Sequence, residues 1–372
     1  MRDAQTPPRR LVSLDAFRGL TIAGMILVNN PGSWSYVYPP LQHAEWHGWT
    51  PTDLIFPYFL FIVGVAIPFS FQRRLGTVAQ AGHLMRHVLR RSLILIALGV
   101  AMRAIPTFDW AEMRLYGVLQ RIGIVYLVAG ASYIYLSSRG RAVTGGVLLL
   151  GYWALMTLVP VPGYGAGDLS PEGNLAAWLD RFLMPGRLWQ GTWDPEGLLS
   201  TFPAAVTSLL GIATGDWLQA DRSGEIKARG MLTAAALLAA LGLVWGLAFP
   251  INKNLWTSSF TLFTSGTALL LFGSMYWLID VKRLRGPWCT WMVVFGMNAI
   301  AVYVASGMAS KMLGYIRIGG EDGLSIYNWV YEVVFRDWAG DVNGSLAFAL
   351  AYVAIWLGLI WVLHAKRVYI KI

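Results

Sequence analysis

The sequence predicts an all-α, polytopic integral membrane protein, built as a bundle of about ten transmembrane helices. Of the 372 residues, 56% are hydrophobic and only 13% are charged, whereas a soluble domain carries about 25% charged residues. The chain also contains 18 tryptophans, whose amphipathic rings concentrate at membrane–water interfaces. The third observation is a series of apolar stretches, each about as long as a helix that crosses the hydrocarbon core.

These apolar stretches define the expected transmembrane helices. They cover residues 11–30, 52–72, 92–106, 115–137, 143–160, 198–219, 230–250, 257–280, 290–312 and 345–363. Residues 324–336 are too few to cross and are expected to form an interfacial or re-entrant helix. An eleventh crossing there would invert the topology of everything after it. No internal repeat or soluble segment stands out, so residues 1–372 are expected to form a single integral membrane domain.

The charge distribution predicts a cytoplasmic N-terminus. With that orientation about nineteen Lys and Arg residues lie in inner loops and about eight in outer ones, and this bias is what orients membrane proteins. Residues 1–10 lead into the first apolar stretch with no signal-peptidase pattern, so that span is expected to be retained. Topology therefore explains the formal charge of +9. The expected partner is the lipid bilayer of a cytoplasmic membrane, and no nucleic acid is expected.

Three ionisable residues stand out among those within the predicted spans, where a charge costs about 2.5–3.5 kcal/mol at the helix centre. Asp15 and Arg18 are three residues apart, so they share a helix face and can form an ion pair. Arg121 has no oppositely charged neighbour in the sequence. We expect it to face a cavity, an anionic ligand or a carboxylate on another helix.

The polar loop at residues 31–51, on the expected outer side, contains the best candidates for chemistry. Histidine is suited to proton transfer near neutral pH and can also act as a nucleophile, so His43 is a catalytic candidate. Its simpler interpretation is an interfacial histidine with its hydrogen bonds satisfied. Asp53 starts the next span, where it can cap the helix or orient a histidine.

A metal site is the competing interpretation of His43, Glu45 and His47. On a helix the two histidines would share a face while Glu45 points elsewhere, which is not the arrangement of the metalloprotease motif. The single cysteine, Cys289, excludes an internal disulfide and a cysteine-based metal cluster. The remaining histidines lie in inner segments, so no metal is expected.

Two further groups of polar residues lie on the expected outer side. Asp194 and Glu196 precede a span, where acidic residues favour a helix N-terminus, and they are also candidates for binding a cationic or polyhydroxylated substrate. Asn252, Lys253 and Asn254 occupy a short loop between two spans. Because this short loop contains several polar residues in a row, we expect it to form part of the wall of a substrate pocket.

Several sequence blocks, taken together and in order, resemble the heparan-α-glucosaminide N-acetyltransferase family in its shorter bacterial form. They are SLDAFRGLTIAGMILVNN (13–30), HAEWHGWTPTDLIFPYFLFIVG (43–64), GVLQRIG (117–123), DPEGLLST (194–201), INKNLW (251–256) and FGMNAIAVYV (295–304). The resemblance runs nearly end to end. It implies transfer of an acetyl group from cytosolic acetyl-CoA to an amino sugar or related glycan on the outer side, and it makes a homodimer plausible.

The resemblance also assigns roles to residues. The family's active histidine falls in an H-x-x-W motif, which here gives His43, and its companion asparagine matches Asn29, at a slightly longer spacing. His47 stands where relatives tend to have Asn, so no catalytic role is transferred to it. A bacterium has no lysosome, so the resemblance leaves the acceptor open.

The resemblance combines with the charge pattern into a mechanism with two variants. His43 either attacks the thioester to give an acetyl-imidazole or acts as general base on the acceptor amine, with Asp53 orienting it and Asn29 donating a hydrogen bond to the developing oxyanion. Arginine binds phosphate through two parallel hydrogen bonds. The candidate residues for the CoA path and its phosphates are Arg18, Arg121, Arg73, Arg74, Arg90 and Arg91.

Two functions from other classes remain open at the level of sequence. A secondary transporter of a small polar or anionic solute also has broken helices and buried charges. Against it, no inverted repeat is evident, and the densest polar motif lies at the outer interface rather than the midplane. The other class is a structural or assembly subunit. If the protein were one, the grouping of His43, Asn29 and Asp53 would have no catalytic purpose and would be a coincidence.

Overall fold

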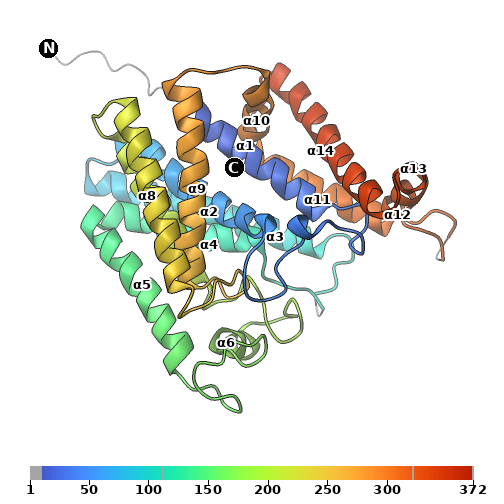
Figure 1. Cartoon of the computed structure of the whole chain (residues 1–372), viewed down its shortest axis with the longest axis horizontal. Helices are drawn as coiled ribbons and strands as arrows, with labels where there is room; N and C mark the ends of the chain where they lie inside the picture. The colour runs from blue at the N-terminus through green and yellow to red at the C-terminus, as the bar shows by residue number, and fades with distance from the viewer. Residues whose placement is uncertain (1–10, 111, 321, 371–372) are drawn as a thin grey trace.

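A computed structural model describes residues 11–110, 112–320 and 322–370, and Figure 1 shows a bundle of helices over this part of the chain. In the described residues no strand forms, and only isolated β-bridges join loops. The all-α class is therefore confirmed.

Each predicted span coincides with helix. The helices are α1 (Val12–Asn29), α2 (Pro51–Phe71), α3 (Val78–Ala104), α4 (Val118–Tyr135), α5 (Ser138–Leu158), α7 (Thr201–Gln219), α8 (Gly224–Trp245), α9 (Ser258–Tyr276) with the π-helical η3 (Trp277–Val281), α10 (Pro287–Met297), α11 (Ala299–Tyr315) and α14 (Asp341–Ala365). In the described chain seven helices are long and apolar enough to cross a membrane, or eight if α10 and α11, bent by 79°, form one span. The number of spans and the side of the N-terminus stay predictions.

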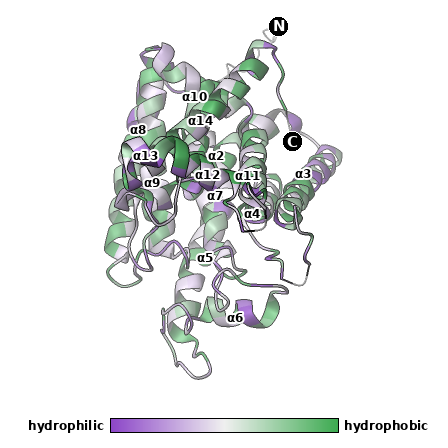
Figure 2. Cartoon of the chain, turned by 90° about the vertical axis from the view of Figure 1, so that its right-hand side faces the viewer, coloured by the Kyte–Doolittle hydropathy of each residue, from purple (hydrophilic) through white to green (hydrophobic). Residues whose placement is uncertain are grey.

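Two segments carry helix outside the predicted spans, and a third is helical where a short helix was expected. The third predicted span starts at residue 92, whereas α3 begins at Val78, after an N-cap in which Thr77 accepts from the Gln80 backbone. Figure 2 shows hydrophilic residues on α3, which explain why hydropathy missed its first half. The loop at residues 161–197 contains α6 (Leu175–Leu183). Residues 326–339 form short helical pieces: α12 (Ile326–Val330), η4 (Tyr331–Arg336) and α13 (Asp337–Ala339).

The long helices pack in pairs, with α8 against α9, α2 against α7, α1 against α10 and α3 against α4; α8 and α9 run side by side in Figure 1. Glycines allow the α2–α7 pair to approach closely. A Cβ at Gly64 would lie 2.0 Å from the Ser208 carbonyl oxygen, and one at Gly211 would lie 2.2 Å from that of Phe61. Small residues at such contacts are typical of helix pairs in membranes, where van der Waals packing drives association.

Helix α2 links the two regions that matter for function. Its 21 residues span about 30 Å at 1.5 Å per residue. Asp53 lies in its first turn, beside the loop that carries His43, and the short helix η2 (Gln72–Arg74) follows its last residue. The candidate catalytic histidine and the predicted phosphate-binding arginine Arg74 are therefore at opposite ends of one helix.

Candidate active site

His43 forms a tight pair with Asp53. The His43 Nδ1 atom lies 2.6 Å from Asp53 Oδ1, and the Asp53 side chain is 1% exposed while that of His43 is 48% exposed. The other carboxylate oxygen, Oδ2, accepts hydrogen bonds from the backbone N–H groups of Ala44 and Thr50, each at 3.0 Å. Asp53 thus caps α2 and orients His43 at once, the two roles that its sequence position predicted.

Lys253 completes this group from a distant part of the chain. Its Nζ lies 2.9 Å from Nδ1 and 3.2 Å from Nε2 of His43, and 3.5 Å from Asp53 Oδ1. Burial lowers the pKa of Lys253, while the carboxylates of Asp53 and Glu196 act in the opposite direction. The structure therefore brings together His43, Asp53 and Lys253, which were predicted from separate motifs.

Two loops hold this arrangement in place. The Gly48 N–H donates to the Ile251 carbonyl oxygen at 2.8 Å, and Gly48 has a φ of +99°, a left-handed conformation that favours glycine. Asn252 is fully buried. Its Oδ1 accepts from the Leu255 N–H at 2.9 Å, and its Nδ2 lies 3.3 Å from His47 Nδ1. Asn252 therefore shapes the turn that presents Lys253.

His47 and Asn254 are more peripheral. Burial lowers the pKa of His47, which disfavours its cationic form. Asn254 is half-buried in the same turn as Lys253. Asn29 is the last residue of α1 and is exposed, whereas its neighbour Asn30 is buried and donates to the Ile26 carbonyl oxygen at 2.7 Å. In the described chain no hydrogen bond joins Asn29 to His43, so its catalytic role stays a prediction.

Asp194 and Glu196 form an ion-pair cluster with Arg114, a residue that the sequence did not single out. Arg114 donates from Nε to Asp194 Oδ2 at 2.6 Å and from Nη2 to Asp194 Oδ1 at 2.5 Å, and it also contacts Glu196. Burial raises the pKa of Glu196, but the guanidinium groups of Arg114 and Arg121 outweigh burial and lower it overall. This bidentate pairing commits Asp194 to holding the loop, while Glu196 also acts electrostatically on Lys253.

Arg121 supports the same loop. It is 1% exposed, donates to the Gly197 carbonyl oxygen at 2.9 Å and contacts the Ser200 hydroxyl. Its guanidinium lies over the Trp256 ring, 5.2 Å from the centroid, a cation–π contact. Arg121 therefore lies near the His43 end of the bundle, on α4, rather than among the other predicted CoA-binding arginines.

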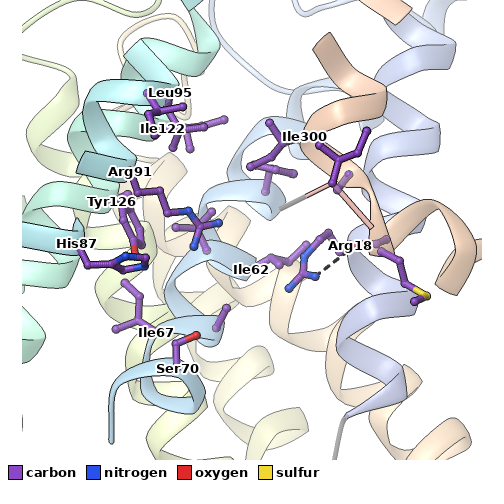
Figure 3. A pocket seen from close by; sticks show the side chains of 18 of the residues that line it. Arg18, Ile62, Ile67, Ser70, His87, Arg91, Leu95, Ile122, Tyr126 and Ile300 are labelled. Atoms are coloured by element: carbon purple, nitrogen blue, oxygen red, sulfur yellow. Dashed lines mark hydrogen bonds between the residues drawn. The ribbon is translucent and has the colours of Figure 1, made fainter. Parts of the chain in front are cut away.

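A cavity of about 930 Å³ lies at the other end of α2. It reaches the size of the larger ligand pockets in proteins, which run to about 1,000 Å³. In Figure 3, His87, Arg91 and Tyr126 line one side of the cavity, and Arg18 and Ile300 line the other. Four of the predicted CoA-binding residues belong to its lining: Arg18, Arg74, Arg90 and Arg91.

The cavity combines positive charge with an apolar wall. Arg18 pairs with Asp15 at 3.2 Å, as their spacing predicted. Arg91 lies over the Tyr126 ring, 4.9 Å from the centroid, and its buried Nε has no hydrogen-bond partner. An elongated ligand with an anionic end and an apolar or polar-neutral arm fits this lining. The side chain of Arg73 lies outside the described part of the structure.

A buried aromatic cluster separates the cavity from His43. The cavity lining extends along α2 to Phe59, six residues from Asp53, or about 9 Å along the axis. Phe56, Trp256 and Phe260 fill this interval. The ring centroid of Phe56 lies 5.1 Å from that of Trp256, and the ring centroid of Phe260 lies 5.5 Å from it. Trp256 has a φ of 49°, a conformation rare for bulky residues, which its surroundings must therefore hold.

Within the described residues, no group of three or more His, Cys, Asp or Glu side chains is arranged to hold a metal ion. His43 and His47 contact Asp53, Lys253 and Asn252 instead. A histidine that a buried carboxylate orients can supply acid–base or nucleophilic chemistry.

Comparison with known proteins identifies the relatives of this chain. A family model described as heparan-alpha-glucosaminide N-acetyltransferase, catalytic, matches residues 10–249. A human protein named heparan-alpha-glucosaminide N-acetyltransferase is 29% identical, over 98% of this chain and 60% of its own length. A mouse protein of the same name is 30% identical, over 79% of this chain and 53% of its own length. The chain thus spans little more than half the length of these relatives, and Lys253 lies just beyond the matched range of the family model.

Proposed function

Because this chain belongs to the heparan-α-glucosaminide N-acetyltransferase family, we propose that it is a transmembrane acetyltransferase. It moves an acetyl group from acetyl-CoA to the amino group of a glucosamine-type sugar or a related glycan. The observation that carries this proposal is the arrangement along α2, with the His43–Asp53 pair at one end and an arginine-lined cavity at the other.

On this proposal the cavity takes the CoA part of the donor from the cytosol. Acetyl-CoA carries several phosphate charges, and arginine binds phosphate through paired, charge-assisted hydrogen bonds. The pantetheine arm then points along α2 towards the aromatic cluster of Phe56, Trp256 and Phe260. These rings must shift for the thioester to reach His43. The excess of basic residues in the loops on the cavity side supports a cytosolic orientation and a place in a bacterial cytoplasmic membrane.

His43 then carries the chemistry on the opposite side. Asp53 accepts from Nδ1–H, so Nε2 carries the lone pair. In one variant Nε2 attacks the thioester carbon, CoA leaves as a thiolate, and the acceptor amine takes the acetyl group from the imidazole. In the other variant, Nε2 removes a proton from the acceptor amine while the amine attacks the thioester carbon of acetyl-CoA directly. The first variant predicts an acetyl group trapped on His43 in the absence of acceptor.

The test compares wild type with His43→Ala, both purified in detergent. We expect both proteins to bind acetyl-CoA with similar affinity in isothermal titration calorimetry, and only wild type to transfer acetyl to glucosamine. His83→Ala is a matched control, because His83 lies on α3 outside the cavity lining. Failure of wild type to bind acetyl-CoA would contradict the proposal.

A secondary transporter remains the second candidate because α10 and α11 are bent by 79° beside the cavity. Broken helices next to a binding site are a feature of transporters. The two functions differ in one measurable respect. A transferase converts acetyl-CoA into free CoA, whereas a transporter moves its solute across a vesicle membrane without cleaving the thioester.

A further inference from the structure

Lys253 was predicted to line a substrate pocket, but its Nζ lies within 3.2 Å of both ring nitrogens of His43, the candidate catalytic residue. We propose that the Lys253 ammonium is a catalytic hydrogen-bond donor to the carbonyl oxygen of the acetyl group while that group is under attack. This inference rests on the proposed acetyl transfer and assigns the residue that stabilises its oxyanion. Its first support is position, since Lys253 Nζ contacts both nitrogens of the His43 ring.

The tautomer of His43 determines what Lys253 can do there. The Asp53 carboxylate is held by two backbone donors, the N–H groups of Ala44 and Thr50, and an ionised carboxylate only accepts hydrogen bonds. The proton between Asp53 and His43 therefore lies on Nδ1. Because Nδ1–H cannot accept, the lone pair of Nε2, 3.2 Å from Lys253 Nζ, accepts from the ammonium in the free enzyme. The ammonium gives up this hydrogen bond for one to the carbonyl oxygen when the acetyl group arrives, which frees the lone pair for the reaction.

The same contact puts a donor where charge develops. The carbonyl oxygen is bonded to the acetyl carbon. When that carbon approaches Nε2, the oxygen therefore comes within hydrogen-bonding reach of Lys253 Nζ. In the nucleophilic variant the Nε2 lone pair forms the N–C bond, the C=O pair moves onto oxygen, and its return expels the CoA thiolate. In the general-base variant the amine nitrogen forms the N–C bond while Nε2 takes the amine proton, the C=O pair again moves onto oxygen, and its return expels the CoA thiolate. Lys253 donates to that oxygen in both variants.

The site holds Lys253 ready before the substrate arrives. Fixed donors stabilise an oxyanion most when no reorganisation is needed during the reaction. The side chain of Lys253 is only 15% exposed, and its turn is fixed by the buried Asn252 and by the bond from Gly48 to Ile251. Burial lowers the pKa of Lys253, and the negative charges of Asp53, at 3.5 Å, and Glu196 act against this in favour of the ammonium.

The neighbouring cations contact other groups, whereas Lys253 contacts the histidine. Arg114 is paired with Asp194 and Glu196. Arg121 donates from Nη2 to Gly197 and Ser200 and lies over the Trp256 ring, while its Nε and Nη1 have no hydrogen-bond partner. Among the described residues, Lys253 is the cation that contacts the imidazole of His43.

The experiment compares Lys253→Met, Lys253→Arg and wild type, with Lys282→Met as control. Met keeps the length of the side chain without its charge. Lys282 is an exposed lysine that pairs with Glu225 far from the site. For each protein we would measure acetyl-CoA affinity, kcat with acetyl-CoA and glucosamine, and release of nitrophenolate from p-nitrophenyl acetate, an activated acetyl ester that does not need the CoA cavity.

We expect Lys253→Met to lower kcat by about 100- to 1,000-fold, the cost of removing one oxyanion donor in other enzymes. Acetyl-CoA affinity should stay unchanged, because Lys253 lies outside the cavity lining. Lys253→Arg keeps a cationic donor and should retain more activity than Lys253→Met. Lys282→Met should match wild type.

Each other result is decisive. A kcat of Lys253→Met within about threefold of wild type, or a loss found in donor affinity alone, would overturn the inference. If wild type does not use acetyl-CoA, the proposed function fails, and the ester assay decides the role of Lys253. A loss of ester cleavage in Lys253→Met then supports it, and equal rates overturn it. No cleavage of either donor by wild type overturns both proposals.

Discussion

The two ends of α2 hold their functional groups in different ways. At the His43 end, the candidate catalytic residues have defined partners: Asp53 orients the imidazole, and two backbone N–H groups fix Asp53. At the other end, the cavity is walled largely by apolar side chains, and Arg91 keeps a buried Nε without a partner. The first end constrains atoms closely, while the second leaves hydrogen-bonding capacity for a ligand to use.

This difference indicates a division of labour along one helix. Catalysis needs groups held in place before the reaction, because reorganisation during the reaction reduces their effect. Binding of a polyanion instead gains from cations that lack internal partners, since no existing ion pair has to be broken. Substitutions at the two ends should therefore separate kcat from donor affinity, and each prediction below tests that separation.

The largest expected effect is on kcat, from Asp53→Asn. The amide would present an N–H to Nδ1 of His43 and favour the tautomer with the proton on Nε2, where the lone pair is needed. We expect kcat to fall by about 100- to 10,000-fold, the range of general acid–base and tautomer effects. Acetyl-CoA affinity should not change, because the cavity lining ends at Phe59, about 9 Å along α2 from Asp53.

The control for this variant is Asp168→Asn, which changes another carboxylate in the outer loops, bonded to the Ser170 N–H. Single-turnover kinetics with saturating acetyl-CoA separate chemistry from binding. Comparable single-turnover rates in Asp53→Asn and wild type would mean that the His43–Asp53 pair serves only the stability of the loop.

The reverse pattern is expected for Arg91→Gln. Arg91 lines the cavity, and a hydrogen bond to a charged group contributes about 1.5–3 kcal/mol. Its loss should weaken acetyl-CoA binding about tenfold or more, with kcat at saturating donor little changed. Arg139→Gln, on the exposed start of α5, is the matched control. A drop in kcat without a change in acetyl-CoA affinity would contradict the proposal that the cavity end of α2 serves donor binding and the His43 end serves catalysis.

Sequence reasoning found the parts of both ends that depend on local patterns. The H-x-x-W motif gave His43, the helix start gave Asp53, and the short polar loop gave Lys253. Arg18 of α1, Arg74 of η2, and Arg90 and Arg91 of α3 line one cavity, because these elements meet at the same end of α2. Hydropathy also located the long helices, since the apolar length needed to cross a membrane is itself a strong constraint.

Long-range pairing was beyond the reach of sequence patterns. Arg114 lies 80 residues from Asp194, its bidentate partner, and no spacing rule connects them. For the same reason Arg121 was grouped with the CoA-binding arginines, although it contacts Gly197 and Ser200 near the other end. Each position depends on which helices become neighbours, and tertiary packing rather than local sequence decides that.

The smallest expected effect concerns stability at the His43 end, through Asp180 on α6. Asp180 is 1% exposed, its Oδ1 accepts from the Leu198 N–H at 2.9 Å, and it lies beside the loop of Asp194 and Glu196. Burial is the main cause that raises the pKa of Asp180 to about 7. A pKa raised in the folded state means that the folded protein holds this proton more tightly than the unfolded chain.

The contribution of Asp180 is therefore fully present below its unfolded pKa, near 4, and is lost as pH rises through about 7. The wild-type Tm should fall from about pH 4 to pH 7, and level off above that, relative to that of Asp180→Asn, which keeps an oxygen acceptor for Leu198 but does not titrate. A difference of 1 kcal/mol corresponds to about 2–4 °C. Thermal unfolding of both proteins across this range measures it. Parallel Tm curves would mean that Asp180 does not titrate there, and the loop beside His43 would then owe no pH dependence to this residue.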